Sequence, residues 1–228
     1  MGNAIGKTNK LETLADFDIN IPLHKALRND QAKTIDGLVA TKFKETLGRY
    51  TCVGATTGTL TTNGTFSTTA TGNLNLYHVK NIVDQLQKWD VEPFPDGNYV
   101  GIASVAALRG IKDDTNTGGW IDASRYAGSK RLLTGEVGEY MGVRWIRDTH
   151  SMSNSVGNTS IYGEAVVFGQ DTVQEAVAIP PEIRVDTPRD FGRDIGVAWY
   201  GIAGWQLIWD QYSSANGWYP HIIYVGSA

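Results

Sequence analysis

The first residues of the chain have types that suit phosphate binding. Gly2, Gly6, Lys7 and Thr8 occur in the order found in a phosphate-binding loop. Such a loop has four residues between its glycines and follows an apolar strand, so that its backbone amides converge on the phosphate. In this chain three residues separate the glycines, and no apolar strand precedes them. We therefore expect no nucleotide site here.

Neither the histidines nor the carboxylates are spaced for metal binding or acid–base catalysis. Zinc ligands must converge to within ~2.1 Å of the ion, and the histidines show no ligand-like spacing. We expect them at the surface or at helix ends; they are His24, His78, His150 and His221. The acid pairs are Asp113 with Asp114 and Asp190 with Asp194. A glycosidase pair needs a separation of ~5–9 Å across a cleft, and solvated carboxylates are the commoner case.

Cys52 is the single cysteine, which excludes an internal disulfide and a cysteine metal cluster. No pattern typical of a thiol nucleophile surrounds it, so we expect a small buried apolar side chain. The sequence thus predicts no catalytic, cofactor-binding or metal-binding residue, and therefore no enzyme and no cofactor.

Tryptophans are the remaining chemically distinctive residues. Four of the seven lie near the C-terminus: Trp199, Trp205, Trp209 and Trp218. Large aromatic rings suit either a sugar-stacking platform or the core and subunit interfaces of a protein. We favour core and interface, and keep a carbohydrate-binding module as the alternative.

The composition bounds the class of protein. With 228 residues, of which 41% are hydrophobic, the chain can bury a core as one domain or two small ones. A net charge of −4 gives no electrostatic reason for tight binding to nucleic acid or to an anionic membrane. No stretch approaches ~18 apolar residues, and no apolar run follows Lys7 and Lys10, so we expect no membrane span and no secretory signal.

A long helix is the clearest predicted element. Residues 1–20 are polar and weakly patterned, and we expect an arm or extended lead-in there. From Pro22 to Leu47 apolar residues recur at helical spacing, with Pro22 in the first turn and Gly48 as the stop. About 26 residues would extend roughly 39 Å, which indicates a spine across an extended structure.

An uncharged, threonine-rich segment follows this helix. Residues 50–79 contain no Asp, Glu, Lys or Arg. Threonine favours strands, and Asn63-Gly64 is a strong two-residue hairpin signal. We predict a β-hairpin or ordered loop, with a flexible linker as the alternative.

The rest of the chain alternates short helices with strands. Helices are predicted at 76–89 and, capped by Ser104, at 105–112, while 121–133 is ambiguous and 115–119 and 151–160 read as loops. Strands are predicted at 99–103, 143–147, 165–168 and 173–179, and 195–208 is a long apolar segment. The order predicts an α+β fold with segregated elements.

Four blocks of sequence, taken in order, resemble phage major capsid proteins of the HK97 fold, most of all the family found in N4-like phages. They are Tyr77–Gln87 with Pro95–Ala103, Ala107–Asp114 with Gly119-Trp120, Gly135–Arg144 running to Thr149, and Ile161–Gln170 with Pro181–Ile183 and Gly196–Gly201. The block from Gly135 to Thr149 is the most specific of the four.

The resemblance implies a spine helix, a peripheral domain and an axial domain. Residues 1–92 would form the N-terminal arm, spine helix and threonine-rich part of the peripheral domain. Residues 93–165 would form the axial domain, and 166–228 the return strands of the peripheral domain and a C-terminal tail. In this fold an arm and an extended loop usually precede the spine helix, whereas only about 20 residues do so here.

The resemblance also implies a function. The chain would assemble as hexamers and pentamers into the icosahedral shell of a tailed phage, enclosing double-stranded DNA that it contacts without reading its sequence. It would be made in the host cytoplasm and reside in the virion, with portal, scaffold and decoration proteins as partners and no membrane. Because charges set orientation between subunits, the interface candidates are the charged residues Arg125, Lys130, Arg131 and Glu136, together with Trp120. The alternatives are an encapsulin-type shell, or a carbohydrate-binding or tail-fibre module.

Overall fold

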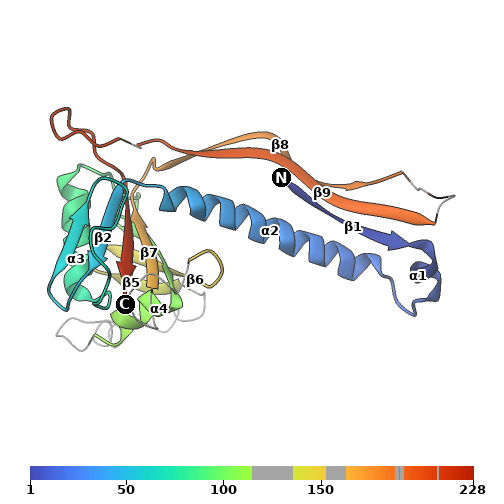
Figure 1. Ribbon diagram of the computed structural model, residues 1–228, viewed down its shortest axis with the longest axis horizontal. Coiled ribbons are helices and arrows are strands. Elements are labelled where there is room, and N and C mark those ends of the chain that lie inside the picture. Colours follow the sequence, from blue (N-terminus) through green and yellow to red (C-terminus); the bar gives the residue numbers. More distant parts are fainter. Residues whose placement is uncertain (115–135, 153–162, 188–189, 191–192, 210) are drawn as a thin grey trace. The chain divides into compact units, whose positions relative to one another are not determined.

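The computed structural model describes residues 1–114, 136–152, 163–187, 190, 193–209 and 211–228 (Figure 1). Contacts divide the chain into two units. Unit 1 comprises Met1–Val39 with Glu175–Gln206, and unit 2 comprises Ala40–Gln174 with Leu207–Ala228. The predicted loop at 115–119 and the ambiguous segment at 121–133 lie outside the described residues, as does most of the loop at 151–160.

Unit 1 is a three-stranded sheet covered by a long helix, α2. The strand order is β1-β9-β8, and β1 runs antiparallel to β9. The strands are β1 (Gly2–Thr8), β8 (Val173–Val185) and β9 (Asp194–Leu207), and the helices are α1 (Asn9–Leu14) and α2 (Asn20–Lys44). Figure 1 shows α2 running along the strands.

The core of unit 1 is small, and it forms where one face of the helix meets one face of the sheet. Leu23 and Leu27, four residues apart, point to one side of α2, and Val197 and Trp199, two residues apart, point to one side of β9. The Trp199 indole N–H also donates to Asp30 Oδ2 of α2 at 2.8 Å. These contacts hold the helix on the sheet.

The predicted long helix is confirmed, but its ends differ. The helix begins at Asn20, whose N–H donates to Asp18 Oδ1 at 2.9 Å. Pro22 therefore lies in the first turn, where its missing N–H has no acceptor within the helix. The helix ends at Lys44, and Gly48 begins β2 (Gly48–Cys52) instead of stopping the helix.

The expected extended lead-in at residues 1–20 was only partly right. Residues 2–8 are extended, but as a sheet strand with Gly2 opposite Tyr200 and Thr8 opposite Asp194. Thr8 then caps α1, because its hydroxyl accepts the Leu11 N–H at 3.3 Å. Strand pairing with β9, some 190 residues away in sequence, gives this polar segment its order.

Unit 2 is a seven-stranded mixed sheet with the order β3-β2-β10-β7-β4-β6-β5. Besides β2, its strands are β3 (Gly58–Thr61), β4 (Tyr99–Ser104), β5 (Glu136–Tyr140), β6 (Val143–Asp148), β7 (Gly163–Phe168) and β10 (Ile222–Ser227); its helices are α3 (Leu76–Lys88) and α4 (Val105–Lys112). The predicted helices and the Ser104 cap are confirmed, since the Ser104 hydroxyl accepts the Ala107 N–H at 3.3 Å.

Both faces of this sheet are covered. One face packs against α3 and α4 in a cluster that includes Ile82, Leu86, Leu108 and Trp145. The central strands β7 and β10 are buried along their whole length. Cys52 belongs to the cluster that packs against α3 and α4, and it is fully buried, as predicted. The architecture is thus mixed α/β, with the larger core in unit 2.

The threonine-rich hairpin is confirmed, but its turn was placed wrongly. β2 and β3 pair antiparallel, and the chain reverses at residues 53–57, where the Val53 N–H donates to the Thr57 carbonyl at 2.9 Å. Asn63-Gly64 follows β3 instead. Gly64 has a φ of +75° and its N–H donates to the Leu47 carbonyl. The flexible-linker alternative is wrong.

Strand β8 is longer than the predicted 173–179 because it continues through Pro180-Pro181. A proline lacks the N–H that a central strand needs, but β8 has β9 as its one neighbour, so it lies at the edge of the sheet. The apolar segment 195–208 is strand β9. No described helix is long and apolar enough to cross a membrane.

The contact between α4 and β7 generates a stability prediction. A Cβ added to Gly163 would lie 2.2 Å from the backbone nitrogen of Ala107, whereas one added to Gly6 in β1 meets nothing within 4 Å. We expect Gly163→Ala to lower the free energy of unfolding by about 1–3 kcal/mol and Gly6→Ala to leave it nearly unchanged. Denaturant titration measures both, and equal effects of the two variants would contradict the described packing.

Candidate interaction surfaces

The segments that looked chemical in the sequence have structural roles in the described chain. Gly2–Thr8 is β1, so its backbone amides lie along a strand and do not converge on a phosphate. Within the described residues, no group of three or more His, Cys, Asp or Glu side chains is placed to hold a metal ion.

His78, expected at the surface or a helix end, lies in the first turn of α3 but is fully buried. Its Nε2 is 2.7 Å from the Gly54 carbonyl oxygen, which can only accept, so Nε2 carries the proton. Nδ1, 3.0 Å from the Tyr50 oxygen, then accepts the phenol proton. Burial lowers the pKa of His78, and the hydrogen bond to Gly54 offsets part of this shift. Burial raises the pKa of Tyr50 to about 12. The pair is a neutral structural link.

Three of the four carboxylates in the two acid pairs have described partners outside their pair. Asp113 faces Arg109 on α4, with 3.5 Å between Oδ2 and Nε. Asp114 is buried, and its Oδ2 accepts the Leu76 N–H at the start of α3 at 2.8 Å. Asp190 pairs with Arg193 at 2.8 Å. These carboxylates fix local structure, and no described contact joins them as a catalytic pair.

A buried charge cluster in unit 2 was not found from the sequence. Glu164 of β7 accepts the Tyr224 hydroxyl and forms an ion pair with Lys44. The Arg49 guanidinium lies over the Tyr224 ring, 4.5 Å from its centroid, and is also near Phe66. Burial raises the pKa of Tyr224 and lowers that of Arg49. Glu164 is the buried charge of this cluster, and its partner Lys44 is partly exposed.

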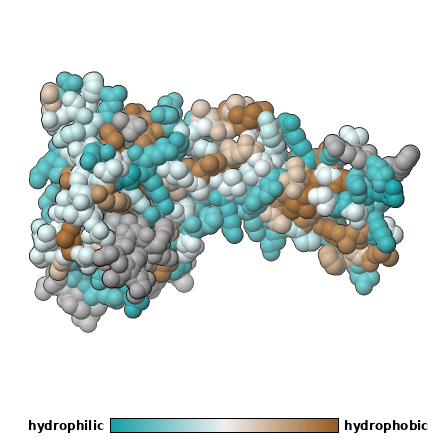
Figure 2. Space-filling model, in the orientation of Figure 1, coloured by the Kyte–Doolittle hydropathy of each residue, from teal (hydrophilic) through white to brown (hydrophobic). Residues whose placement is uncertain are grey.

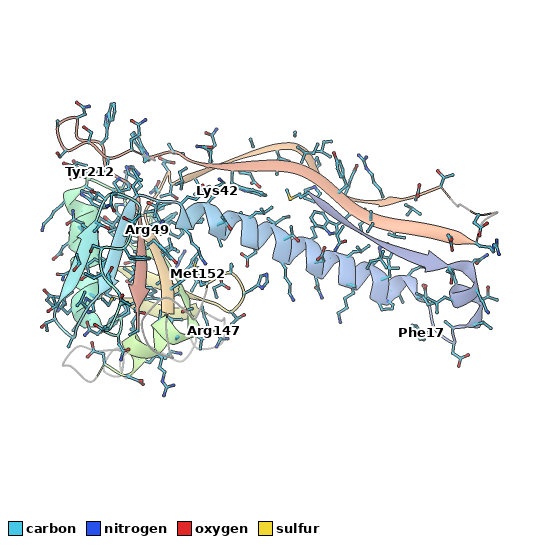
Figure 3. The ribbon with its side chains drawn as sticks, in the orientation of Figure 1. Phe17, Lys42, Arg49, Arg147, Met152 and Tyr212 are labelled. Carbon is cyan, nitrogen blue, oxygen red and sulfur yellow. The ribbon has the colours of Figure 1, made fainter. Side chains whose placement is uncertain are left out.

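The C-terminal tryptophans do not form one platform. Trp199 is buried in unit 1, while Trp209 and Trp218 of unit 2 are 45% and 46% exposed. Trp209 stacks on His221 with 4.9 Å between ring centroids. Tyr212, also exposed, faces Tyr219 and is labelled in Figure 3. The chain thus uses tryptophan in its core and also presents aromatic surface on unit 2.

The end of unit 1 that carries α1 exposes several large apolar side chains. Leu14 and Phe17 are 71% and 67% exposed, and Leu11 and Ile21 are exposed as well. Figure 2 shows hydrophobic side chains gathered at this end of the unit. We call residues 11–21 the tip. Apolar side chains gathered on a surface make it a candidate for contact with another molecule.

The predicted interface residues remain predictions. Trp120, Arg125, Lys130 and Arg131 lie outside the described residues, and Glu136 begins β5 with its backbone opposite Ile146. The tip was missed. Its signal was present, since Leu11, Leu14 and Phe17 recur at a spacing of three in a segment too short to build a core helix.

No protein-family model matches the chain, and no curated protein matches it by sequence. Solved structures do match. The chain aligns over its full length with the head structure of Helicobacter pylori bacteriophage KHP40 at a TM-score of 0.72, 11% identity and 74% coverage of that chain. It also aligns over its full length with the capsid of Ralstonia phage GP4, at a TM-score of 0.70, 11% identity and 72% coverage of that chain. The alignment with the cyanophage Pam1 capsid has a TM-score of 0.65, 15% identity and 74% coverage of that chain. The chain therefore has the fold of these phage capsid proteins.

The buried His78 predicts acid sensitivity. Because its folded pKa is below that of the unfolded chain, the unfolded state takes up the proton first, and stability falls as pH drops below about 6.5. One such group changes the free energy of unfolding by at most about 1.4 kcal/mol per pH unit. Denaturant titrations from pH 7.5 to 5 should show a flatter profile for His78→Gln than for the wild type.

His24, which is exposed on α2, supplies the matched control for this measurement. His24→Gln controls for the replacement of an exposed histidine, and the wild type and both variants retain His221, whose pKa burial also lowers. If wild type and His78→Gln lose stability in parallel, the neutral His78–Tyr50 link is wrong.

Proposed function

We propose that this chain is a major capsid protein of the HK97 fold, a subunit that assembles with its own copies into the icosahedral shell of a tailed phage. The observation that carries the proposal is the likeness of the whole chain to phage capsid structures. The carboxylates and buried histidine that have described partners are used in folding, which is consistent with a structural role.

A shell subunit works through many modest contacts made at once. Interfaces of ~800 Å² per partner are weak singly and become stable when closed symmetry repeats them. The tip and the exposed aromatic residues Trp209, Tyr212 and Trp218 are surfaces suited to such contacts. We propose hexamers and pentamers as the rings, with Arg125, Lys130, Arg131 and Glu136 setting register between neighbours and Trp120 as a further interface residue.

The parts of the chain would correspond to the parts of the HK97 fold. We propose α2 as the spine helix and residues 93–165 as the axial domain, with 1–92 and 166–228 peripheral. These bounds differ from the contact-defined units, in which residues 40–92 group with 93–165. We propose that the chain belongs to the major capsid protein family found in N4-like phages.

The remaining partners follow from the shell. Portal, scaffold and decoration proteins would contact it, and packaged double-stranded DNA would lie inside, held without sequence reading by a chain whose net charge is −4. The location would be the virion capsid, with assembly in the host cytoplasm. The exposed Trp209 and Trp218 favour a carbohydrate-binding module as the second candidate.

Assembly of the purified chain tests the proposal. We expect sedimentation velocity and light scattering to show large particles, alone or with a scaffold, and electron microscopy to show closed shells. Monomers under all assembly conditions would contradict it. Specific binding on a glycan array by a non-assembling chain would favour the second candidate, and an enclosed enzyme without a genome would identify an encapsulin-type shell.

A further inference from the structure

Unit 1 contains an open cavity between α2 and the edge strand β8. Its volume is about 600 Å³, and its lining residues are His24, Lys25, Arg28, Gln31, Ala32, Pro181 and Ile183. We call this cavity the groove. Pro181 and Ile183 supply apolar surface from β8, and α2 supplies the polar side chains.

The groove is electropositive. Lys25 and Arg28 are exposed, and no ion pair joins either to another described residue. The nearest acidic residues along the two elements are engaged elsewhere: Asp30 accepts from Asn3 and Trp199, and Glu182 pairs with Arg184. The groove thus offers two cations beside an apolar wall.

The edge of the sheet beside the groove does not favour an added strand. Pro180 and Pro181 remove two N–H donors from β8, so a ligand pairing with this edge would lose part of the hydrogen-bond ladder. A partner in the groove must be held by side chains.

The tip of the same unit has the complementary composition. Phe17 lies between Asp16 and Asp18, and all three are exposed. Asp18 is used locally, because its Oδ1 accepts the Asn20 N–H, whereas Asp16 has no described partner. Figure 3 shows Phe17 on the connection between α1 and α2, at the end of the unit. An apolar anchor flanked by carboxylates matches an apolar wall flanked by cations.

We propose that the tip of one copy docks into the groove of a second copy, with Phe17 against Pro181 and Ile183 and Asp16 facing Lys25 and Arg28. This inference deepens the proposed function and rests on it. A second copy is needed because, within one chain, Phe17 is 67% exposed and the groove is open. The contact joins two different patches, so it closes a symmetric ring or continues from copy to copy.

A designed disulfide tests the contact directly. Asp16→Cys combined with Ala32→Cys should form a disulfide between chains under mild oxidation. An intrachain bond is excluded by distance, because residues 20–32 of α2 alone span ~18 Å and Phe17, the neighbour of residue 16, lies beyond the start of the helix (Figure 3), whereas bonded cysteines have Cα atoms within about 7 Å. Cys52 is fully buried and does not compete.

The matched control moves the second cysteine by one residue. Lys33 is exposed on α2 but does not line the groove. Asp16→Cys with Lys33→Cys should give at least tenfold less cross-linked dimer on a non-reducing gel. Equal yields from the two pairs, or no dimer from either, would overturn the docking.

Charge reversal gives an independent readout in solution. Asp16→Lys alone and Arg28→Glu alone should each weaken self-association at least tenfold by sedimentation, and the two together in one chain should restore much of it. A double variant weaker than both single variants would overturn the pairing, as would an Arg28→Glu defect seen only in DNA binding.

The outcome separates this inference from the proposed function. Shells that form without a selective Asp16→Cys–Ala32→Cys cross-link would leave the capsid role standing and remove the docking. A selective cross-link in dimers or small rings that never close into shells would support the docking and remove the capsid role.

Discussion

The packing of α2 against a single three-stranded sheet is the constraint on which unit 1 depends. A helix of 25 residues is ~38 Å long, and one sheet covers one side of it. Leu23 and Leu27 use that side against Val197 and Trp199. The other side, the tip and the groove remain open to solvent. Another molecule could cover these surfaces, and under the proposed function that molecule is a second copy of the chain.

Unit 2 covers both faces of its sheet with residues of the same chain. Its seven-stranded sheet is covered on one face by α3 and α4, and a second cluster that includes Phe168 and Tyr224 covers residues of the other face. Two buried polar groups there have side-chain partners: His78 contacts Tyr50, and Glu164 pairs with the partly exposed Lys44.

Local signals in the sequence predicted much of this fold. The spacing of apolar residues gave α2 and α3, and the Ser104 cap and apolar runs gave α4 and the central strands. Long-range pairing was beyond such signals. Pairing with β9 orders β1. The β2–β3 register places the hairpin turn at 53–57, although Asn63-Gly64 is the stronger turn signal in the sequence of this segment.

The candidate surfaces were predicted less well, for a related reason. Phe17 is buried or exposed according to whether another segment packs against it, and the spacing of residues along the chain does not reveal such tertiary contacts. The groove needs α2 and β8, whose lining residues are some 150 positions apart. The resemblance noted in the sequence found the capsid fold, while the residues that would join copies emerged from exposure and charge in three dimensions.

Electron cryomicroscopy of particles assembled from the purified chain tests the central claim most directly. The account predicts a closed icosahedral shell in which the tip of each subunit is covered by a neighbouring copy. A chain that yields no closed particle, or a shell in which residues 11–21 face solvent on every subunit, would contradict it.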